Sequence, residues 1–306
     1  MPTTAKVICD SISESGVRLT TMVLEYPRII HSEVMTHRMF SRNASSSRAI
    51  PIEKQIERVE NNPFIPKEWG SNKRGMQAGE QILDYQIKDA VKTWTYAKDV
   101  MVTAVGSLMY SNVHKQLANR LLEPFSHIQV VVTATEWDNF FLQRLDKNAQ
   151  PEIQELARVM KEAMDNSIPF KMPLTAWHCP FIEAKDWDEV EFYIRREGQE
   201  TWDDMSEVAL QHIIKISVAR CARVSYGLNE RGWGDIEKDL ALYDMLLTNN
   251  HWSPFEHQAT PMKYWLSPYA VGHALGVTHV DNDQFLWSGN FKGWIQNRQL
   301  IQQSNG

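Results

Sequence analysis

The residues best suited to chemistry are concentrated between His37 and Pro51, where the chain reads HRMFSRNASSSRAIP. Three arginines, a histidine and four serines share this stretch, which is too polar to be buried as core. Arginine forks bind phosphate oxygens in pairs, and serine hydroxyls can complete such a shell. The sequence has no G-x-x-x-x-G-K-[ST] and no strand-linked G-x-G-x-x-G, so neither standard nucleotide loop is present. We therefore predict an anion site built from side chains; the alternative is a solvated basic loop.

A second candidate is the segment HWSPFEH, which runs from His251 to His257. Its two histidines and Glu256 could suggest a metal, but the histidines are separated by Pro254 and lack the helical spacing of metal ligands. We expect no metal there. Ser253, with Glu256 three residues later, predicts a capping box at a helix N-terminus, and such an end can also receive an anion.

Two further arginines stand in otherwise apolar segments, Arg120 in ANRLLEP and Arg144 in QRLDKNAQPEI. Taken singly, each pattern is more typical of a surface arginine or an ion-pair member. The neighbours His178 and Cys179 could form a thiol pair, but adjacent side chains rarely face each other. A catalytic cysteine is therefore disfavoured.

The segments that position these residues combine strand and helix patterns. β-Branched residues and partial alternation predict two strands over residues 6–26, separated by a Glu-Ser-Gly turn. A helix is expected after Pro27, so that the arginine-rich stretch lies at or just past its end. Residues 52–75 contain the prolines and glycines typical of a loop.

Most of the remaining chain has a helical pattern. Residues 76–122 are predicted to form two helices, divided at Gly106 or at Ser111–Asn112. The run IQVVVTATEW is the clearest strand, and Pro151 lies near the first turn of a helix with an apolar stripe. Two more helices are expected, in EVALQHIIKISVARCARVSY and in DIEKDLALYDMLLTNN.

The composition favours a soluble, cytoplasmic protein. The formal net charge of −6 opposes general binding to a nucleic acid polymer. The three cysteines form no C-x-x-C pair, which is typical of a reducing compartment. The first residues lack a signal pattern, and no apolar run reaches membrane-spanning length. We expect neither a membrane nor a nucleic acid polymer as a partner.

Taken together, these segments resemble the flavin-dependent thymidylate synthases, the ThyX family. THRMFSRNASSSR is similar to the family motif R-H-R-x7-S, with His37, Arg38 and Ser46 at or next to the matching positions. ANRLLEP and QRLDKNAQPEI look like R-x-x-x-P and R-x4-A-Q-x-E-I, which places Arg120 and Arg144. ARVSY and HWSPFEH match two more family segments.

The order of these segments differs from that of the family, in which A-R-V-S-Y and S-P-F-E-H precede R-H-R. The resemblance therefore implies a ThyX-like α+β fold, an antiparallel sheet with long helices, in circularly permuted order. The closing NFKGWIQNRQL looks like a partial second copy of the helix that normally leads to R-H-R. We expect residues 1–165 to carry the R-H-R-type and A-Q-x-E-I segments, residues 166–205 to be a Pro- and Trp-rich insertion or connector, and residues 206–306 to complete one interwoven domain.

Several positions depart from the family pattern. Thr36 replaces the first arginine of R-H-R, Glu33 replaces a glutamine, Ala44 replaces a glutamate and Ala49 replaces a tyrosine. Two alternatives to thymidylate synthesis therefore stay open. One is flavin- and folate-dependent hydroxymethylation or methylation of another pyrimidine nucleotide, such as dCMP. The other is a non-catalytic nucleotide-binding protein.

The resemblance implies a methyltransferase that converts dUMP to dTMP, with FAD as cofactor, methylenetetrahydrofolate as carbon donor and NADPH as reductant. It also implies a homotetramer with sites assembled from several subunits. Arg144 would be the catalytic residue, stabilising negative charge on the uracil ring. The implied cofactor-binding residues are His37, Arg38, Asn139, Asn148, His251, Ser253 and Glu256. The implied substrate-binding residues are Ser46, Ser47, Arg48, Arg120, Arg144 and Ser225.

Overall fold

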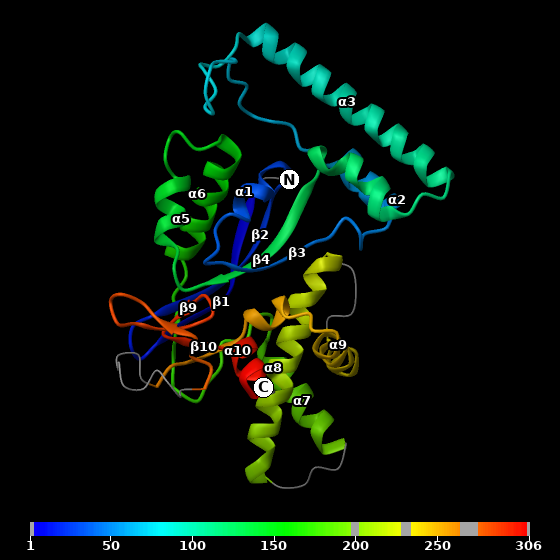
Figure 1. Cartoon of the computed structure of the whole chain (residues 1–306). Helices are drawn as coiled ribbons and strands as arrows, with labels where there is room; N and C mark the ends of the chain where they lie inside the picture. The colour runs from blue at the N-terminus through cyan, green and yellow to red at the C-terminus, as the bar shows by residue number, and fades with distance from the viewer. Residues whose placement is uncertain (1–2, 197–201, 228–233, 264–274, 305–306) are drawn as a thin grey trace.

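A computed structural model describes residues 3–196, 202–227, 234–263 and 275–304 (Figure 1). Its centre is a five-stranded sheet with the strand order β3-β4-β2-β1-β5. Neighbouring strands run antiparallel, except that β1 and β5 are parallel. The strands are β1 (Thr4–Ser13), β2 (Arg18–Pro27), β3 (Ser41–Ala44), β4 (His127–Ala134) and β5 (Phe170–Met172).

The hairpin of β1 and β2 confirms the first sequence prediction. Its turn contains Gly16, whose φ of 85° is left-handed and is adopted by glycine without strain. Met22 and Leu24 of β2 are fully buried, and helix α6 (Pro151–Asp165) packs against both strands. The predicted mixed α+β class, with an antiparallel sheet and long helices, is confirmed.

The helix expected after Pro27 is short. A 3₁₀ turn, η1 (Arg28–Ile30), leads into α1 (His31–Val34), and the chain then returns to the sheet as β3. Arg42 ends the helix, because its Nη1 donates to the carbonyls of Val34, Met35 and His37 at 3.0–3.2 Å. The arginine-rich stretch is therefore a turn, a strand and a second turn along the edge of the sheet.

The segment predicted as a loop contains a helix, α2 (Ile52–Asn61), so that part of the prediction is wrong. Its buried side is formed by Ile52, Gln55 and Val59. The long α3 (Asp84–Tyr110) includes Gly106 and ends at Ser111–Asn112, the second of the two predicted divisions. It is followed by α4 (Lys115–Ala118) and η2 (Asn119–Phe125), and Figure 1 shows α3 projecting above the sheet.

Helices α5 (Asp138–Arg144) and α6 lie side by side along the sheet (Figure 1). Pro151 occupies the first turn of α6, as predicted. The apolar stripe of α6 is buried in the main core through Ile153, Leu156, Ala157 and Met160. Arg144 is the last residue of α5, and its side chain reaches His37 in the turn that precedes β3.

The second half of the chain adds a helical layer and a small β region. The helical elements are α7 (Ala184–Arg196), α8 (Trp202–Arg223), η3 (Val224–Tyr226), α9 (Ile236–Thr248), η4 (Ser253–Glu256) and α10 (Asn297–Ser304). The strands are β6 (Ala259–Pro261), β7 (His279–Val280), β8 (Leu286–Ser288), β9 (Phe291–Lys292) and β10 (Trp294–Gln296). The closing segment NFKGWIQNRQL is thus helical only from Asn297 onward.

A buried ion-pair cluster joins α7, α8 and α9. Arg220 of α8, which is 3% exposed, donates to both carboxylate oxygens of Asp186 at 2.7 and 2.8 Å. Its Nε donates to Asp239 of α9 at 3.2 Å, and Arg223 donates to the same carboxylate. Each buried charge has hydrogen-bonded partners of opposite charge, and these contacts offset the free energy lost when the charges are removed from water.

Removal of one partner tests this cluster. We expect Asp186→Ala to lower the free energy of unfolding by about 3–5 kcal/mol, because Arg220 is left buried and under-paired. Glu191→Ala, which breaks an exposed pair with Arg195 on the same helix, should cost less than about 1 kcal/mol. Urea unfolding measures both. Equal losses in the two variants would contradict a structural role for the cluster.

Candidate functional site

A cavity of about 500 Å³ lies beside the turn that precedes β3. Its lining includes His37 and Arg38 from that turn and Asn139 from α5, three of the residues predicted to bind a cofactor. Glu136 and Trp287 complete other parts of the lining. The structure therefore brings three separately predicted residues to one cavity.

His37 and Arg144 are in direct contact at this cavity. The Nε of Arg144 donates to Nε2 of His37 at 2.9 Å, so the imidazole accepts at that nitrogen. Burial, with the nearby charges of Arg144 and Arg42, lowers the pKa of His37 to about 4. Glu33, which stands where the family has glutamine, lies 3.5 Å from Arg144 as an ion-pair partner. Within the described chain, its Oε2 is buried and has no hydrogen-bond partner.

Arg38 is the free cation of this group. Its side chain is exposed at the cavity, and among the described residues it forms no hydrogen bond or ion pair. The Asn139 amide oxygen accepts from Gln143 at 3.3 Å, which leaves its amide nitrogen available. A free guanidinium beside an amide suits a ligand that carries phosphate and ring polar atoms.

The predicted phosphate-binding residues Ser47 and Arg120 meet at a carboxylate. Ser47 donates to Oε1 of Glu123 at 2.8 Å, and Arg120 donates to the same oxygen at 2.7 Å. Arg28 also pairs with this oxygen, at 3.0 Å. No sequence motif indicated a role for Arg28 or Glu123, although Glu123 belongs to the segment ANRLLEP. The buried Asn119 fixes the serine turn, because its amide donates to the Ser47 carbonyl at 2.7 Å.

Ser46 and Ser225 are also brought together. The backbone N–H of Ser46 donates to the carbonyl of Ser225 at 2.9 Å, so the ARVSY segment reaches the serine turn. Arg48 is exposed on that turn, and its side chain makes no hydrogen bond or ion pair to the described residues. Two guanidinium groups are thus available to a ligand, Arg38 in the turn before β3 and Arg48 in the turn after it.

The predicted capping box at Ser253 is wrong. Ser253 is exposed and is the first residue of the short 3₁₀ turn η4, which has Trp252 as its N-cap and no side-chain capping bond. Glu256 does not fold back to the cap, because its carboxylate pairs with Arg298 of α10. His251 is exposed beside this turn.

Asn148 is not among the residues that line the cavity beside Arg38. It is exposed in the turn between α5 and α6, where its backbone N–H donates to Asp146 at 2.8 Å. Among the described residues, no group of three or more His, Cys, Asp and Glu side chains could hold a metal ion. No helix in the described ranges is long and apolar enough to cross a bilayer.

A chain of buried hydrogen bonds crosses the sheet behind the site. The Asn43 amide nitrogen donates to His257 Nε2 at 3.1 Å and to the Ser253 carbonyl at 3.1 Å. His257 Nδ1 is hydrogen-bonded to the Thr133 hydroxyl at 2.8 Å, and the Thr133 and Thr21 hydroxyls are hydrogen-bonded to each other at 2.8 Å. The HWSPFEH segment is thereby attached to three strands, β3, β4 and β2.

The same chain of hydrogen bonds continues to His178. The Thr21 hydroxyl is hydrogen-bonded to His178 Nε2 at 2.8 Å, and the Ser11 hydroxyl is hydrogen-bonded to His178 Nδ1 at 2.8 Å. Both nitrogens of each imidazole are bonded to uncharged groups, which can satisfy a neutral ring with one donor and one acceptor nitrogen. Complete burial lowers the pKa of His178 and of His257 to about 3. Burial raises the pKa of the Cys179 thiol, and His178 points to Thr21 and Ser11.

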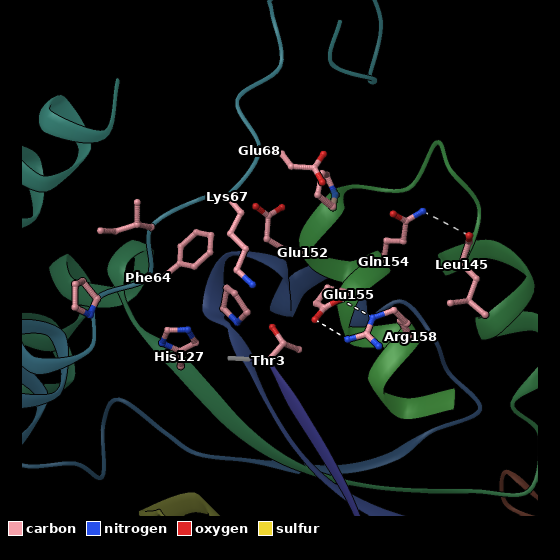
Figure 2. Close-up of a pocket in the computed structure, with 14 residues that line it drawn as sticks. Thr3, Phe64, Lys67, Glu68, His127, Leu145, Glu152, Gln154, Glu155 and Arg158 are labelled. Carbon is pink, nitrogen blue, oxygen red and sulfur yellow. Dashed lines mark hydrogen bonds and ion pairs between the residues drawn. The ribbon is translucent and has the colours of Figure 1, made fainter. Parts of the chain in front are cut away.

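A second cavity, of about 420 Å³, lies between the segment around Phe64 and the start of α6 (Figure 2). Its lining contains none of the residues predicted to bind cofactor or substrate. Figure 2 shows Glu152 and Glu155 along one side, with Glu155 paired to Arg158 at 2.8 and 3.0 Å. Because its lining carries three carboxylates, Glu68, Glu152 and Glu155, against the two cations Lys67 and Arg158, this cavity suits an anion less well than the cavity beside Arg38.

The chain belongs to the family described as thymidylate synthase complementing protein, whose sequence model matches residues 16–170. The match confirms the ThyX resemblance and its fold, and it ends before the ARVSY and HWSPFEH segments. No curated protein sequence matches the chain.

Solved structures give partial matches. The UMP/dUMP methylase PolB from Streptomyces cacaoi, bound with 5-Br UMP, has a TM-score of 0.44 and 16% identity, over 53% of this chain and 88% of that chain. Thymidylate synthase X from Helicobacter pylori, with FAD and dUMP, has a TM-score of 0.34 and 15% identity, over 48% of this chain and 67% of that chain.

The neutral buried histidines predict acid sensitivity. The folded-state pKa of His178 lies near 3, below the ordinary value, so the unfolded chain binds the additional proton as pH falls. Each such histidine should remove about 2 kcal/mol of stability between pH 6.5 and pH 5, and the loss continues down to the folded-state pKa. Urea unfolding at pH 7 and pH 5 measures this loss.

Two variants separate this effect from general acid unfolding. His178→Asn should be less stable at pH 7, yet its stability should fall less between pH 7 and pH 5 by about 2 kcal/mol. His114→Asn changes an exposed helix-capping histidine and should keep the wild-type dependence. An unchanged pH dependence in His178→Asn would contradict the neutral buried assignment.

Proposed function

We propose that the protein is a flavin-dependent enzyme that methylates dUMP to dTMP, with methylenetetrahydrofolate as carbon donor and NADPH as reductant. The observation that supports this most strongly is the cavity where Arg144 contacts His37 and Arg38 is free. Membership of the thymidylate synthase complementing family supports the same reaction class.

The residues around this cavity fit a flavin nucleotide. Arg38 has an unpaired guanidinium for a phosphate, and Asn139 and His37 offer polar atoms to a ring. FAD, when bound, would supply the reducing equivalents for the new methyl group. The proposed FAD contacts are His37, Arg38, Asn139, Asn148, His251, Ser253 and Glu256.

The serine turn is proposed to receive the phosphate of dUMP. Arg120 is 50% exposed and is held by Glu123, so a phosphate can reach its guanidinium from solvent. Glu123 pairs with both Arg28 and Arg120, and because its single negative charge meets two guanidinium groups, the cluster keeps a net positive charge that can attract a phosphate. The proposed substrate contacts are Ser46, Ser47, Arg48, Arg120, Arg144 and Ser225.

Arg144 has an electrostatic role in this proposal. Its Nε is bonded to His37 and its Nη1 faces Glu33, which fixes the plane of the guanidinium. A guanidinium held in this way stabilises charge that develops on the oxygens of a pyrimidine ring. No cysteine nucleophile is needed, and burial raises the pKa of Cys179 and of Cys221 well above the ordinary value.

Several chains are proposed to complete each site. Within one chain, the residues near Arg38 lie at the start of β3 and the serine turn follows its end, while Ser253 is held beside the strand. A homotetramer that brings the groups of neighbouring chains together would place phosphate and flavin contacts in one cleft.

The altered segment order is proposed to be a circular permutation. Ala259, just after HWSPFEH, packs in one buried cluster with Val17 and Leu19 at the start of β2. In the family order the chain would run from this segment into that strand. Their proximity supports the permutation, with residues 1–165, 166–205 and 206–306 forming one interwoven domain.

Another pyrimidine nucleotide is the alternative substrate, because Glu33, Thr36 and Ala44 change the charge of the R-H-R-type segment relative to the family pattern. Assays with dUMP and dCMP, with product mass determined, separate the two reactions. Methylated dUMP supports the proposal, and a modified dCMP alone would replace it.

The Arg144→Ala variant tests the proposed mechanism. Formation of dTMP should fall by about 10²–10³-fold, because a preorganised charge contact is lost. FAD should stay bound, since Arg38 and Asn139 are unchanged. Lys147→Ala, an exposed cation in the next turn, should keep wild-type turnover. Wild-type turnover in Arg144→Ala would exclude the proposed role.

A further inference from the structure

The cavity beside Arg38 has an aromatic wall that comes from outside the family match. Trp287 of β8 lines this cavity, although the matched residues end at 170. The motifs in the sequence gave no indication of this contribution. It shows that the small β region of the second half reaches the site carried by the first half.

The turn between β8 and β9 is attached to one side of the cavity. Gly289, with a φ of 60°, allows the tight turn, and Asn290 follows it. The Asn290 amide donates to the Met39 carbonyl at 3.0 Å and to the Ser41 hydroxyl at 3.1 Å. The turn is therefore fixed to the residues that follow Arg38.

A second bond attaches the same hairpin to the opposite side. The backbone N–H of Lys292 donates to the Thr135 hydroxyl at 3.0 Å, immediately before Glu136 and helix α5. The hairpin thus spans the two segments that form the rest of the cavity. Trp287 therefore belongs to a hairpin that is hydrogen-bonded to the rest of the protein through both Asn290 and Lys292.

The indole itself is also fixed. Its Nε1 donates to Asp281 at 2.8 Å, and its ring is stacked on His279 with centroids 5.6 Å apart and planes 16° apart. Trp287 is 8% exposed, so little of its freedom remains to be lost when a ligand binds. The small exposed part of this fixed indole lines the cavity, where it can contact a flat ring in an edge-to-face or offset arrangement.

The polar groups of the cavity identify the ring chemistry. Arg38 supplies a free cation and Asn139 an amide. Burial, only partly offset by Lys292, raises the pKa of Glu136. A carboxyl group and an amide near an aromatic wall match the N–H and carbonyl edges of a nitrogen heterocycle, and Arg38 matches an attached phosphate.

We propose that Trp287 is a ligand-binding residue of this cavity, against which the planar nitrogen heterocycle of a nucleotide packs while Arg38 receives its phosphate. This inference rests on the proposed flavin site and adds a residue to it from the C-terminal hairpin. FAD contains two such rings, isoalloxazine and adenine. FMN carries only the first and ADP only the second, so the two probes distinguish them.

Three variants test the inference. Trp287→Ala removes the wall, Trp287→Phe keeps a flat ring without the indole, and Trp69→Phe changes a tryptophan that lines neither cavity described above. Binding of FAD, FMN and ADP to the full chain is measured by equilibrium dialysis. Quenching of tryptophan fluorescence by FMN and thermal unfolding of each variant are measured in parallel.

Trp287→Ala should bind FAD roughly two- to tenfold more weakly than wild type. One of the two probes, FMN or ADP, should lose affinity by the same factor, and that probe identifies the ring that packs against Trp287. Trp287→Phe should bind within about twofold of wild type yet lose part of the quenching, unlike Trp69→Phe. If Trp287→Ala fails to fold, the quenching in Trp287→Phe decides the question.

Two negative results have different meanings. Wild-type protein that binds none of the three probes would overturn the proposed function, and this inference with it. If the wild-type protein binds FAD and Trp287→Ala binds it with the same affinity, this inference alone is overturned. Unchanged quenching in Trp287→Phe would have the same consequence.

Discussion

The rest of the structure depends on the chain of buried hydrogen bonds from Ser11 to Asn43. Buried hydroxyl and imidazole groups are costly unless every donor and acceptor is satisfied, and here each member has a partner on either side. His178 and His257 come from the second half of the chain, whereas the threonines come from the central sheet. The network therefore fixes how the two halves meet.

Contacts of this kind would preserve the site under the circular permutation that we propose. The bond from Ser46 to Ser225 and the bonds from Asn290 to Met39 and Ser41 join positions far apart in sequence. Packing, and not chain continuity, determines which side chains meet. A reordered chain preserves the arrangement as long as the same buried partners remain.

The sequence predicted correctly those helices and strands whose formation depends on residues close together in the chain. The β1–β2 hairpin, the α6 stripe and the division at Ser111–Asn112 follow from alternation, helical spacing and turn residues. The family resemblance supplied His37, Arg38 and Asn139, which share a cavity in the structure.

The errors arise where distant partners override a local pattern. Glu256 has the spacing of a capping residue, but it pairs with Arg298 from the last helix. Arg42 ends a helix that the apolar spacing would extend. Glu123 and Trp287 could not be identified from motifs, since their importance comes from contacts made only after folding.

The central claim is that this chain holds a flavin beside a pyrimidine nucleotide. The most direct measurement is the visible absorbance of the purified protein after incubation with FAD and removal of free flavin. We expect a yellow protein whose flavin spectrum shifts when dUMP is added. A colourless protein that retains no FAD would contradict it.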